Sequence, residues 1–114
     1  FMIRQFPFSE CYFLEGAKKF REALQLPLIY VGGLVSREGI ERALDSGFEL
    51  VQMARALVND PAFVNKLLEG DAATRSECDH RNYCIARMYS VDMKCCKHCG
   101  DLPRKIREEL AKLP

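Results

Sequence analysis

Two stretches carry the main fold signal of this chain: Pro27-Leu-Ile-Tyr-Val-Gly-Gly-Leu-Val-Ser36 and Glu49-Leu-Val-Gln-Met-Ala-Arg-Ala-Leu-Val-Asn-Asp-Pro61. Each begins with a short apolar run, which is typical of a strand covered on both faces in a parallel sheet. Ser36 is a candidate helix N-cap, and Gly47 is a natural stop for the helix that follows it. The two stretches therefore predict strand, glycine turn, helix and second strand, joined by a right-handed crossover.

Further helices are predicted on both sides of this unit. Residues 10–26 repeat apolar side chains at spacings of three and four, and Pro27 cannot continue that helix. Asp60-Pro61 is a helix start signal, and Gly70 closes the helix that it opens. A last amphipathic helix is predicted in the final residues.

The predicted sheet is incomplete. Two parallel strands leave unpaired backbone groups at both edges. The chain also begins with Phe1 rather than methionine. We therefore expect it to be the back end of a longer enzyme, in which residues 1–70 and residues 71–114 form separate parts.

Composition excludes several classes of partner. The 114 residues are 48% hydrophobic and 29% charged, with a formal net charge of +1, as in soluble globular proteins. This charge gives no electrostatic reason to expect nucleic acid or an anionic membrane. No apolar run approaches the ~20 residues of a spanning helix, and the first residues lack the features of a secretory signal. We expect a cytoplasmic protein that binds a small molecule.

The loops after the two predicted strands form a candidate phosphate site. Gly32 and Gly33 have no Cβ to keep an anion from the backbone amides, and Arg55 can reach two phosphate oxygens. Helices that begin near Ser36 and Asp60 could point their N-termini at the same anion. In (β/α)₈ barrels, the loops after the seventh and eighth strands commonly hold a phosphate. Alternatively, the glycines form only a tight turn and Arg55 a surface ion pair.

The run from Leu26 to Leu67, including Tyr-Val-Gly-Gly-Leu-Val-Ser and Gln-Met-Ala-Arg-Ala-Leu-Val-Asn-Asp-Pro, resembles the C-terminal portion of the NADH:flavin oxidoreductase (old yellow enzyme-like) family. The resemblance extends over about residues 10–100. It implies an α/β fold, the C-terminal βαβα portion of a (β/α)₈ TIM barrel, followed by a cysteine-rich, helical extension. It also implies an FMN-dependent enzyme that uses NAD(P)H to reduce activated alkenes.

The same resemblance assigns cofactor-binding residues. In that family, glycines after the seventh strand and Gly-Arg or Ala-Arg after the eighth hold the FMN phosphate. Here these residues are Gly32, Gly33, Ala54 and Arg55, of which Ala54 would offer only its backbone N–H. The family's proton donor and substrate-anchoring residues lie on earlier strands. No segment here matches them, so we expect no catalytic residue in this chain and no activity of the chain alone.

Cysteine and histidine crowd into one part of the extension. Five of the six cysteines lie in residues 78–99, together with both histidines. This clustering favours metal ligation or its relic, rather than a disulfide framework. The open alternatives are free thiols, an iron–sulfur cluster with a substitute ligand, or zinc. The candidate zinc ligands are Cys78, His80, Cys84, Cys96, His98 and Cys99.

A degenerate iron–sulfur pattern is implied by the resemblance. Relatives similar to 2,4-dienoyl-CoA reductase carry a four-iron cluster with a spacing of approximately Cys-x2-Cys-x3-Cys-x11-Cys. Cys78, Cys84 and Cys96 lie close to this register, but Arg81 stands where the second cysteine is expected. Since an arginine cannot ligate iron, these three thiols form at most a partial ligand set.

Two functions of different class therefore follow from the sequence. The first is a fragment of an FMN-dependent NAD(P)H oxidoreductase that carries the phosphate-binding end. The second is a non-catalytic zinc-binding or interaction module built on residues 78–99. Tyr30 is expected to fill space in the core rather than to face a flavin. A homo-oligomer could pair the open sheet edges.

Overall fold

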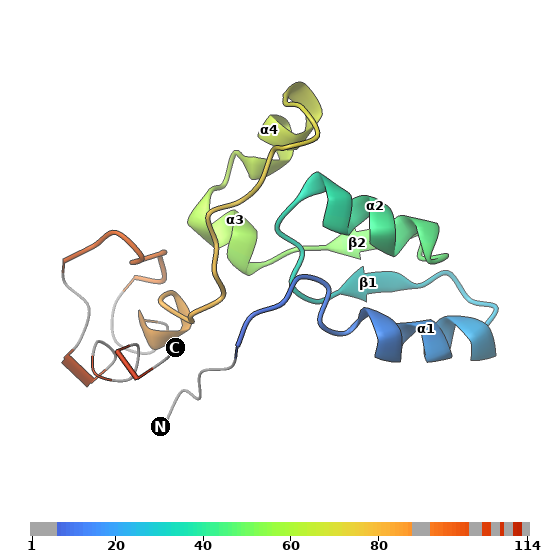
Figure 1. Ribbon diagram of the computed structural model, residues 1–114, viewed down its shortest axis with the longest axis horizontal. Coiled ribbons are helices and arrows are strands. Elements are labelled where there is room, and N and C mark those ends of the chain that lie inside the picture. The colour runs from blue at the N-terminus through green and yellow to red at the C-terminus, as the bar shows by residue number, and fades with distance from the viewer. Residues whose placement is uncertain (1–6, 88–91, 101–103, 106–107, 109–110, 113–114) are drawn as a thin grey trace.

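The computed structural model describes residues 7–87, 92–100, 104–105, 108 and 111–112. The elements are, in chain order, α1 (Leu14–Ala23), β1 (Ile29–Val31), α2 (Arg37–Asp45), β2 (Leu50–Gln52), α3 (Arg55–Asn59), α4 (Phe63–Glu69) and a 3₁₀ turn, Ile85–Arg87 (Figure 1). Among these residues, no helix has the length and apolar character needed to cross a membrane.

The predicted strand–helix–strand unit is confirmed. β1 and β2 pair in parallel, with Tyr30 opposite Val51. Figure 1 shows α1 beside β1 and α2 beside β2. The apolar side chains Ile29, Val31 and Leu50 on these strands are 54–60% exposed. The described sheet is thus covered on the side of Tyr30 and open on the other, and its place in a (β/α)₈ barrel stays a prediction.

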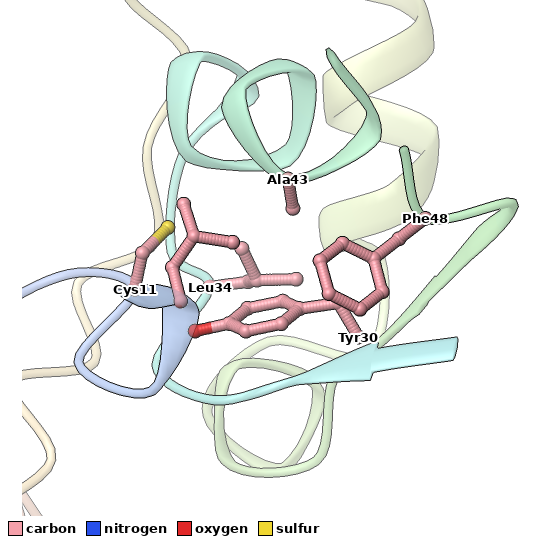
Figure 2. Packing of buried hydrophobic residues seen from close by; sticks show 6 residues of the cluster. Cys11, Tyr30, Leu34, Ala43 and Phe48 are labelled. Carbon is pink, nitrogen blue, oxygen red and sulfur yellow. The ribbon is translucent and has the colours of Figure 1, made fainter. Parts of the chain in front are cut away.

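The main core lies between the two strands and helices α1 and α2. Tyr30 is 1% exposed and packs against Phe48, with ring centroids 5.5 Å apart (Figure 2). Leu14, Leu34 and Ala43 complete this cluster together with Cys11. Burial raises the pKa of Tyr30 to about 12. The prediction that Tyr30 fills space in the core is therefore confirmed.

The start of α2 is fixed from two sides. Ser36 is the N-cap, as predicted, and its hydroxyl accepts a hydrogen bond from the Gly39 amide at 3.0 Å. The carboxylate of Glu10 accepts from the Val35 amide and the Ser36 hydroxyl, both at 2.9 Å. Its second oxygen pairs with Arg75 at 3.1 Å. Glu10 therefore ties the segment before α1 to the loop that follows β1.

Two short helices follow β2, and one of them was not predicted. Helix α3 begins at Arg55 itself, and its single turn is too short to give a periodic pattern. Helix α4 begins at Phe63, so the expected start at Pro61 was wrong by two residues. Asp60 still organises this start, because its carboxylate accepts from the Ala62 amide at 3.0 Å. Ala56 and Phe63, both 1% exposed, form a second small core.

Residues 76–87 and 92–100, here called the thiol segment, return from α4 past α3 (Figure 1). The segment is attached to residues 10–70, here called the α/β part, through the Ser76 amide, which donates to the Val35 carbonyl at 2.7 Å. It contains only the 3₁₀ turn as regular structure among its described residues. The last predicted helix, beyond Gly100, falls largely outside the described residues.

Candidate oxyanion pocket at the strand ends

The turn after β1 has a backbone that requires glycine. Gly32 has φ +153° and Gly33 has φ +69°, both in the region that L-residues with side chains avoid. A Cβ on Gly33 would lie 2.6 Å from the Tyr12 ring, and one on Gly32 would lie 2.9 Å from the Tyr30 hydroxyl. Tyr30 also holds this turn, because its hydroxyl donates to the Gly32 carbonyl at 2.8 Å. The backbone conformation and the aromatic side chains packed against this turn therefore both require glycine here.

The predicted phosphate-binding residues line one pocket. Its walls are Tyr12, Val31, Gly32, Gly33, Leu34, Gln52, Met53, Ala54, Arg55, Ala56 and His80. The pocket has a volume of about 90 Å³, more than the ~10–15 Å³ that a cavity needs, in the same measure, to hold one water molecule. The structure thus brings Gly32, Gly33, Ala54 and Arg55 together at the ends of β1 and β2. A group larger than water fits between them.

Arg55 is held in place by uncharged groups. Its Nη1 donates to the Asn82 side-chain oxygen at 2.8 Å and to the His80 carbonyl at 3.4 Å. Its Nη2 donates to the Tyr12 hydroxyl at 3.0 Å. A guanidinium has five N–H donors, so the three bonds to described residues leave two for another acceptor. The side chain can therefore still bind an oxyanion.

The expected contribution of two helix N-termini to this pocket was wrong. The amide of Val35, just before α2, donates to the Glu10 carboxylate, so a protein anion occupies that position. No residue of α4 lines the pocket, because α3 stands between α4 and β2. The Arg55 side chain and the backbone of Gly32, Gly33 and Ala54, which line the pocket, remain as candidate groups for an anion.

An aromatic wall closes one side of the pocket. The Phe8 ring stacks on His80 with centroids 4.3 Å apart, and the Tyr12 ring stands edge-on to both. Neither ring nitrogen of His80 has a hydrogen-bond partner among the described residues. Burial, and then the nearby Arg55 charge, lower the pKa of His80 to about 4. His80 is therefore neutral near pH 7.

Sequence reasoning did not find Tyr12, Asn82 or Glu10 as parts of this site. All three act across long stretches of chain, at separations of 25 to 43 residues from their partners. A single sequence holds no signal for such pairs. The segment over residues 7–15, Pro-Phe-Ser-Glu-Cys-Tyr-Phe-Leu-Glu, resembles the family as well, but that resemblance did not identify Tyr12 or Glu10 as site residues.

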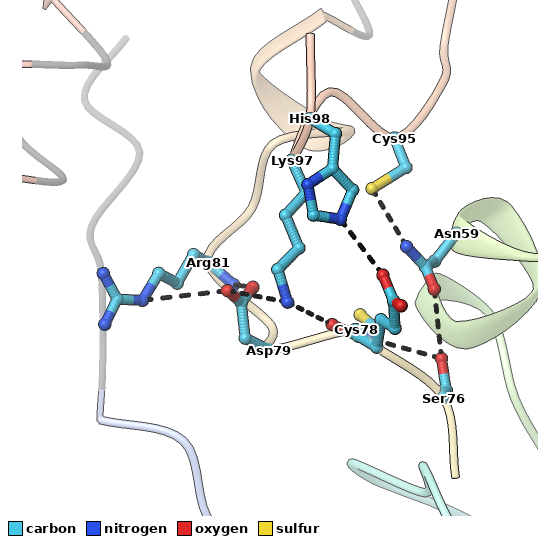
Figure 3. Close-up of polar contacts among 9 residues, drawn as sticks. Asn59, Ser76, Cys78, Asp79, Arg81, Cys95, Lys97 and His98 are labelled. Atoms are coloured by element: carbon cyan, nitrogen blue, oxygen red, sulfur yellow. Dashed lines mark hydrogen bonds and ion pairs between the residues drawn. The ribbon is translucent and has the colours of Figure 1, made fainter.

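Polar contacts hold the thiol segment together (Figure 3). Asp79 pairs with Arg81 at 3.9 Å and with Lys97 at 3.6 Å. The Asn59 amide of α3 donates to the Cys95 sulfur at 3.4 Å. His98, a candidate zinc ligand, contacts the Glu77 carboxylate at 3.0 Å instead. Ion pairs and side-chain hydrogen bonds therefore help to hold this segment in place.

The candidate metal ligands are divided between two surroundings. Cys78 and Cys84 line one small pocket with Cys95, whereas Cys96 is fully buried and does not line it. Burial raises the pKa of the Cys78 and Cys84 thiols, so both favour the protonated form.

Three cationic side chains, Arg55, Arg81 and Lys97, line that same pocket. Within the described part of the chain, no three His, Cys, Asp or Glu side chains are placed to hold a metal ion. As the structure arranges them, Cys78, Cys84 and Cys96 do not form the ligand set of a four-cysteine iron–sulfur cluster. Ligation by Cys78, Cys84 and Cys96 stays a prediction.

The pocket lies at the ends of two parallel strands, and comparison with known proteins gives its context. The chain is similar to 4,4'-dithiodibutanoate disulfide reductase of Rhodococcus erythropolis, with 46% identity over 85 residues, 75% of this chain and 21% of that protein. It is also similar to bilirubin reductase of Mediterraneibacter gnavus, with 30% identity over 69 residues, 60% of this chain and 11% of that protein.

A third relative is the N,N-dimethylglycine/sarcosine dehydrogenase of Chromohalobacter salexigens, 28% identical over 90 residues, which cover 77% of this chain and 13% of the dehydrogenase. All three names are those of oxidoreductases. The chain spans 11 to 21% of the length of these curated relatives. No family model and no solved structure matches it.

Proposed function

We propose that this chain is the FMN-phosphate-binding end of a larger NAD(P)H-dependent flavin oxidoreductase. One observation carries the proposal: the Gly32–Gly33 turn and the half-buried Arg55, at least 22 residues apart in sequence, line one pocket of about 90 Å³. The similarity to oxidoreductases supports the redox part of the proposal. The small share of those proteins that the chain covers supports its being one part of a longer enzyme.

The open sheet face supports the (β/α)₈ barrel as the parent fold. Parallel strands are normally covered on both faces, yet Ile29, Val31 and Leu50 are more than half exposed. Further strands and side chains of a barrel would cover this face and pair both edges of the sheet. In such a barrel the pocket would lie where the last two loops hold a phosphate.

The residues of this chain would bind and orient the cofactor. Arg55 would neutralise the phosphate with its two remaining N–H donors, and the amides near Gly33 and Ala54 would donate to the other oxygens. When bound, FMN supplies hydride transfer between a nicotinamide and an acceptor. We expect the residues that face the reacting atoms to lie on earlier strands, so this chain alone would have no activity.

Two acceptor classes are proposed for the longer enzyme. The family resemblance points to an activated alkene such as an enone, and the relative at 46% identity is named for a disulfide. Oxidation of NADH and of NADPH by the full-length protein, with an enone or with 4,4'-dithiodibutanoate as acceptor, separates the two. Turnover of only the disulfide would remove the ene-reductase type while leaving the flavin proposal intact.

Arg55→Ala in the full-length protein tests the proposal. Loss of a charge-assisted hydrogen bond of this kind should weaken FMN binding roughly ten- to a hundred-fold. Arg104→Ala is the matched control, since the Arg104 side chain is 87% exposed and pairs only with Glu108 among the described residues. Equal FMN content in both variants contradicts the proposal. Stoichiometric zinc without flavin absorbance would instead favour an interaction module on residues 78–99.

A further inference from the structure

The guanidinium of Arg55 is held mainly from the thiol segment. Two of its three partners, the Asn82 side-chain oxygen and the His80 carbonyl, belong to this segment, 27 and 25 residues further along the chain. The third partner, the Tyr12 hydroxyl, precedes Arg55 by 43 residues. These contacts join three distant parts of the chain at one side chain.

The backbone of the thiol segment is shaped for this contact. His80 has φ +58° and Asn82 has φ +62°, both in the left-handed region. Asparagine enters this region more readily than most residues. Asn82 thus combines a tolerated backbone with a side-chain acceptor at the point where the segment meets Arg55. An alanine there would lose both properties.

The chemistry of the partners suits an anion-binding arginine. An amide oxygen, a backbone carbonyl and a phenol orient the guanidinium without cancelling its charge. Within the part of the chain that the structure describes, no carboxylate forms an ion pair with Arg55. A side chain that is already fixed also loses less rotamer freedom when the ligand binds. The contacts therefore prepare Arg55 for an oxyanion.

We propose that Asn82 is a positioning residue that presents Arg55 to the phosphate of FMN. The inference rests on the proposed function of the pocket and extends it to the thiol segment. It gives that segment a role in cofactor affinity that is independent of any metal. Asn82 itself would not touch the phosphate, and its effect would pass through the direction of the Arg55 side chain.

Binding of FMN and of riboflavin by the full-length apoprotein tests this role, because riboflavin lacks the phosphate. Asn82→Gly removes the acceptor oxygen and keeps the left-handed backbone available. We expect it to raise the FMN dissociation constant about tenfold and to leave riboflavin binding unchanged. Asn82→Asp keeps an acceptor oxygen but pairs Arg55 with a carboxylate, so it should also weaken FMN binding and leave riboflavin binding unchanged. Flavin fluorescence quenching measures all of these constants.

The outcomes separate the inference from the proposal beneath it. If Asn82→Gly binds FMN as the wild type does while Arg55→Ala does not, the positioning role is wrong and the proposed function stands. If Asn82→Gly weakens FMN and riboflavin equally, the residue has only a general structural role and the inference fails. If Arg55→Ala binds FMN normally, the proposed function fails, and the role of Asn82 fails with it.

Discussion

The α/β part (residues 10–70) and the thiol segment are stabilised in different ways. In the α/β part, Tyr30, Val35, Ala43 and Phe63 are at most 1% exposed, and helices and strands satisfy the backbone. In the thiol segment, ion pairs and side-chain hydrogen bonds such as those of Asp79, Asn59 and His98 link the described residues. The candidate site lies where the two parts meet. Its glycine turn and strand ends belong to the α/β part, and the groups that orient Arg55 come mainly from the thiol segment.

The largest expected loss of stability follows from removal of a core aromatic ring. Phe63→Ala should lower the free energy of unfolding by about 3–5 kcal/mol, because it leaves a cavity under α3 and α4. Cys84→Ala, at a buried position of the thiol segment, should cost only about 1 kcal/mol. Urea denaturation of the full-length variants measures both. A cost at Cys84 as large as that at Phe63 would contradict this contrast and point to a bound metal.

The next largest loss of stability is expected from a substitution in the Gly32–Gly33 turn. Gly33→Ala forces an alanine to φ +69° and against the Tyr12 ring, which should cost about 2–4 kcal/mol of stability. Gly16→Ala is the matched control, because it lies in α1 with no atom within 4 Å of an added Cβ. That change should raise stability by about 0.5–1 kcal/mol. Equal changes in the free energy of unfolding at the two positions would contradict the steric explanation of the turn.

A smaller effect is expected at Tyr30. Tyr30→Phe removes the hydrogen bond to the Gly32 carbonyl and should lower the free energy of unfolding by about 0.5–1.5 kcal/mol.

The same residue predicts a pH dependence of stability, because the folded pKa of Tyr30 is raised from 10.0 to about 12. Between these values only the unfolded chain loses the proton, so stability should fall as the pH rises from 10 toward 12. The wild-type minus Tyr30→Phe difference in tyrosinate absorbance should titrate near 12. A midpoint near 10 would contradict this.

The smallest effect is expected in the thiol segment itself. The Asp79 side chain is 33% exposed and pairs with Arg81 and Lys97 at 3.6–3.9 Å. Asp79→Asn should therefore cost less than about 1 kcal/mol, and the difference should shrink in high salt. Thermal unfolding at two salt concentrations measures it. A large cost that salt does not change would mean that this segment is held by more than surface ion pairs.

The two parts also differ in how well the sequence predicted them. The strands near residues 28–31 and 49–53 and the Ser36 cap were predicted, because apolar runs and capping depend on neighbours in the chain. Helix α3 was missed, since a five-residue turn has no period to detect. In the thiol segment nothing beyond composition could be predicted, because its structure depends on specific pairs such as Asp79 with Lys97.

The candidate site was predicted in part for the same reason. Gly32, Gly33 and Arg55 directly follow strands, and the carboxyl ends of parallel strands meet at one edge. The partners of Arg55 come from residues 12, 80 and 82, which no local pattern connects to it. The expected role of the α2 N-terminus in binding the anion was wrong, because the carboxylate of Glu10, from a distant segment, already lies at the start of that helix.

The position of the cofactor phosphate in a crystal structure of the full-length, flavin-loaded protein tests the central claim most directly. We predict phosphate oxygens about 2.7–2.9 Å from the Arg55 guanidinium, next to the backbone amides of the Gly32–Gly33 turn, with the Asn82 contact retained. A flavin phosphate bound elsewhere, or an Arg55 side chain turned out of the pocket toward a carboxylate, would contradict the claim.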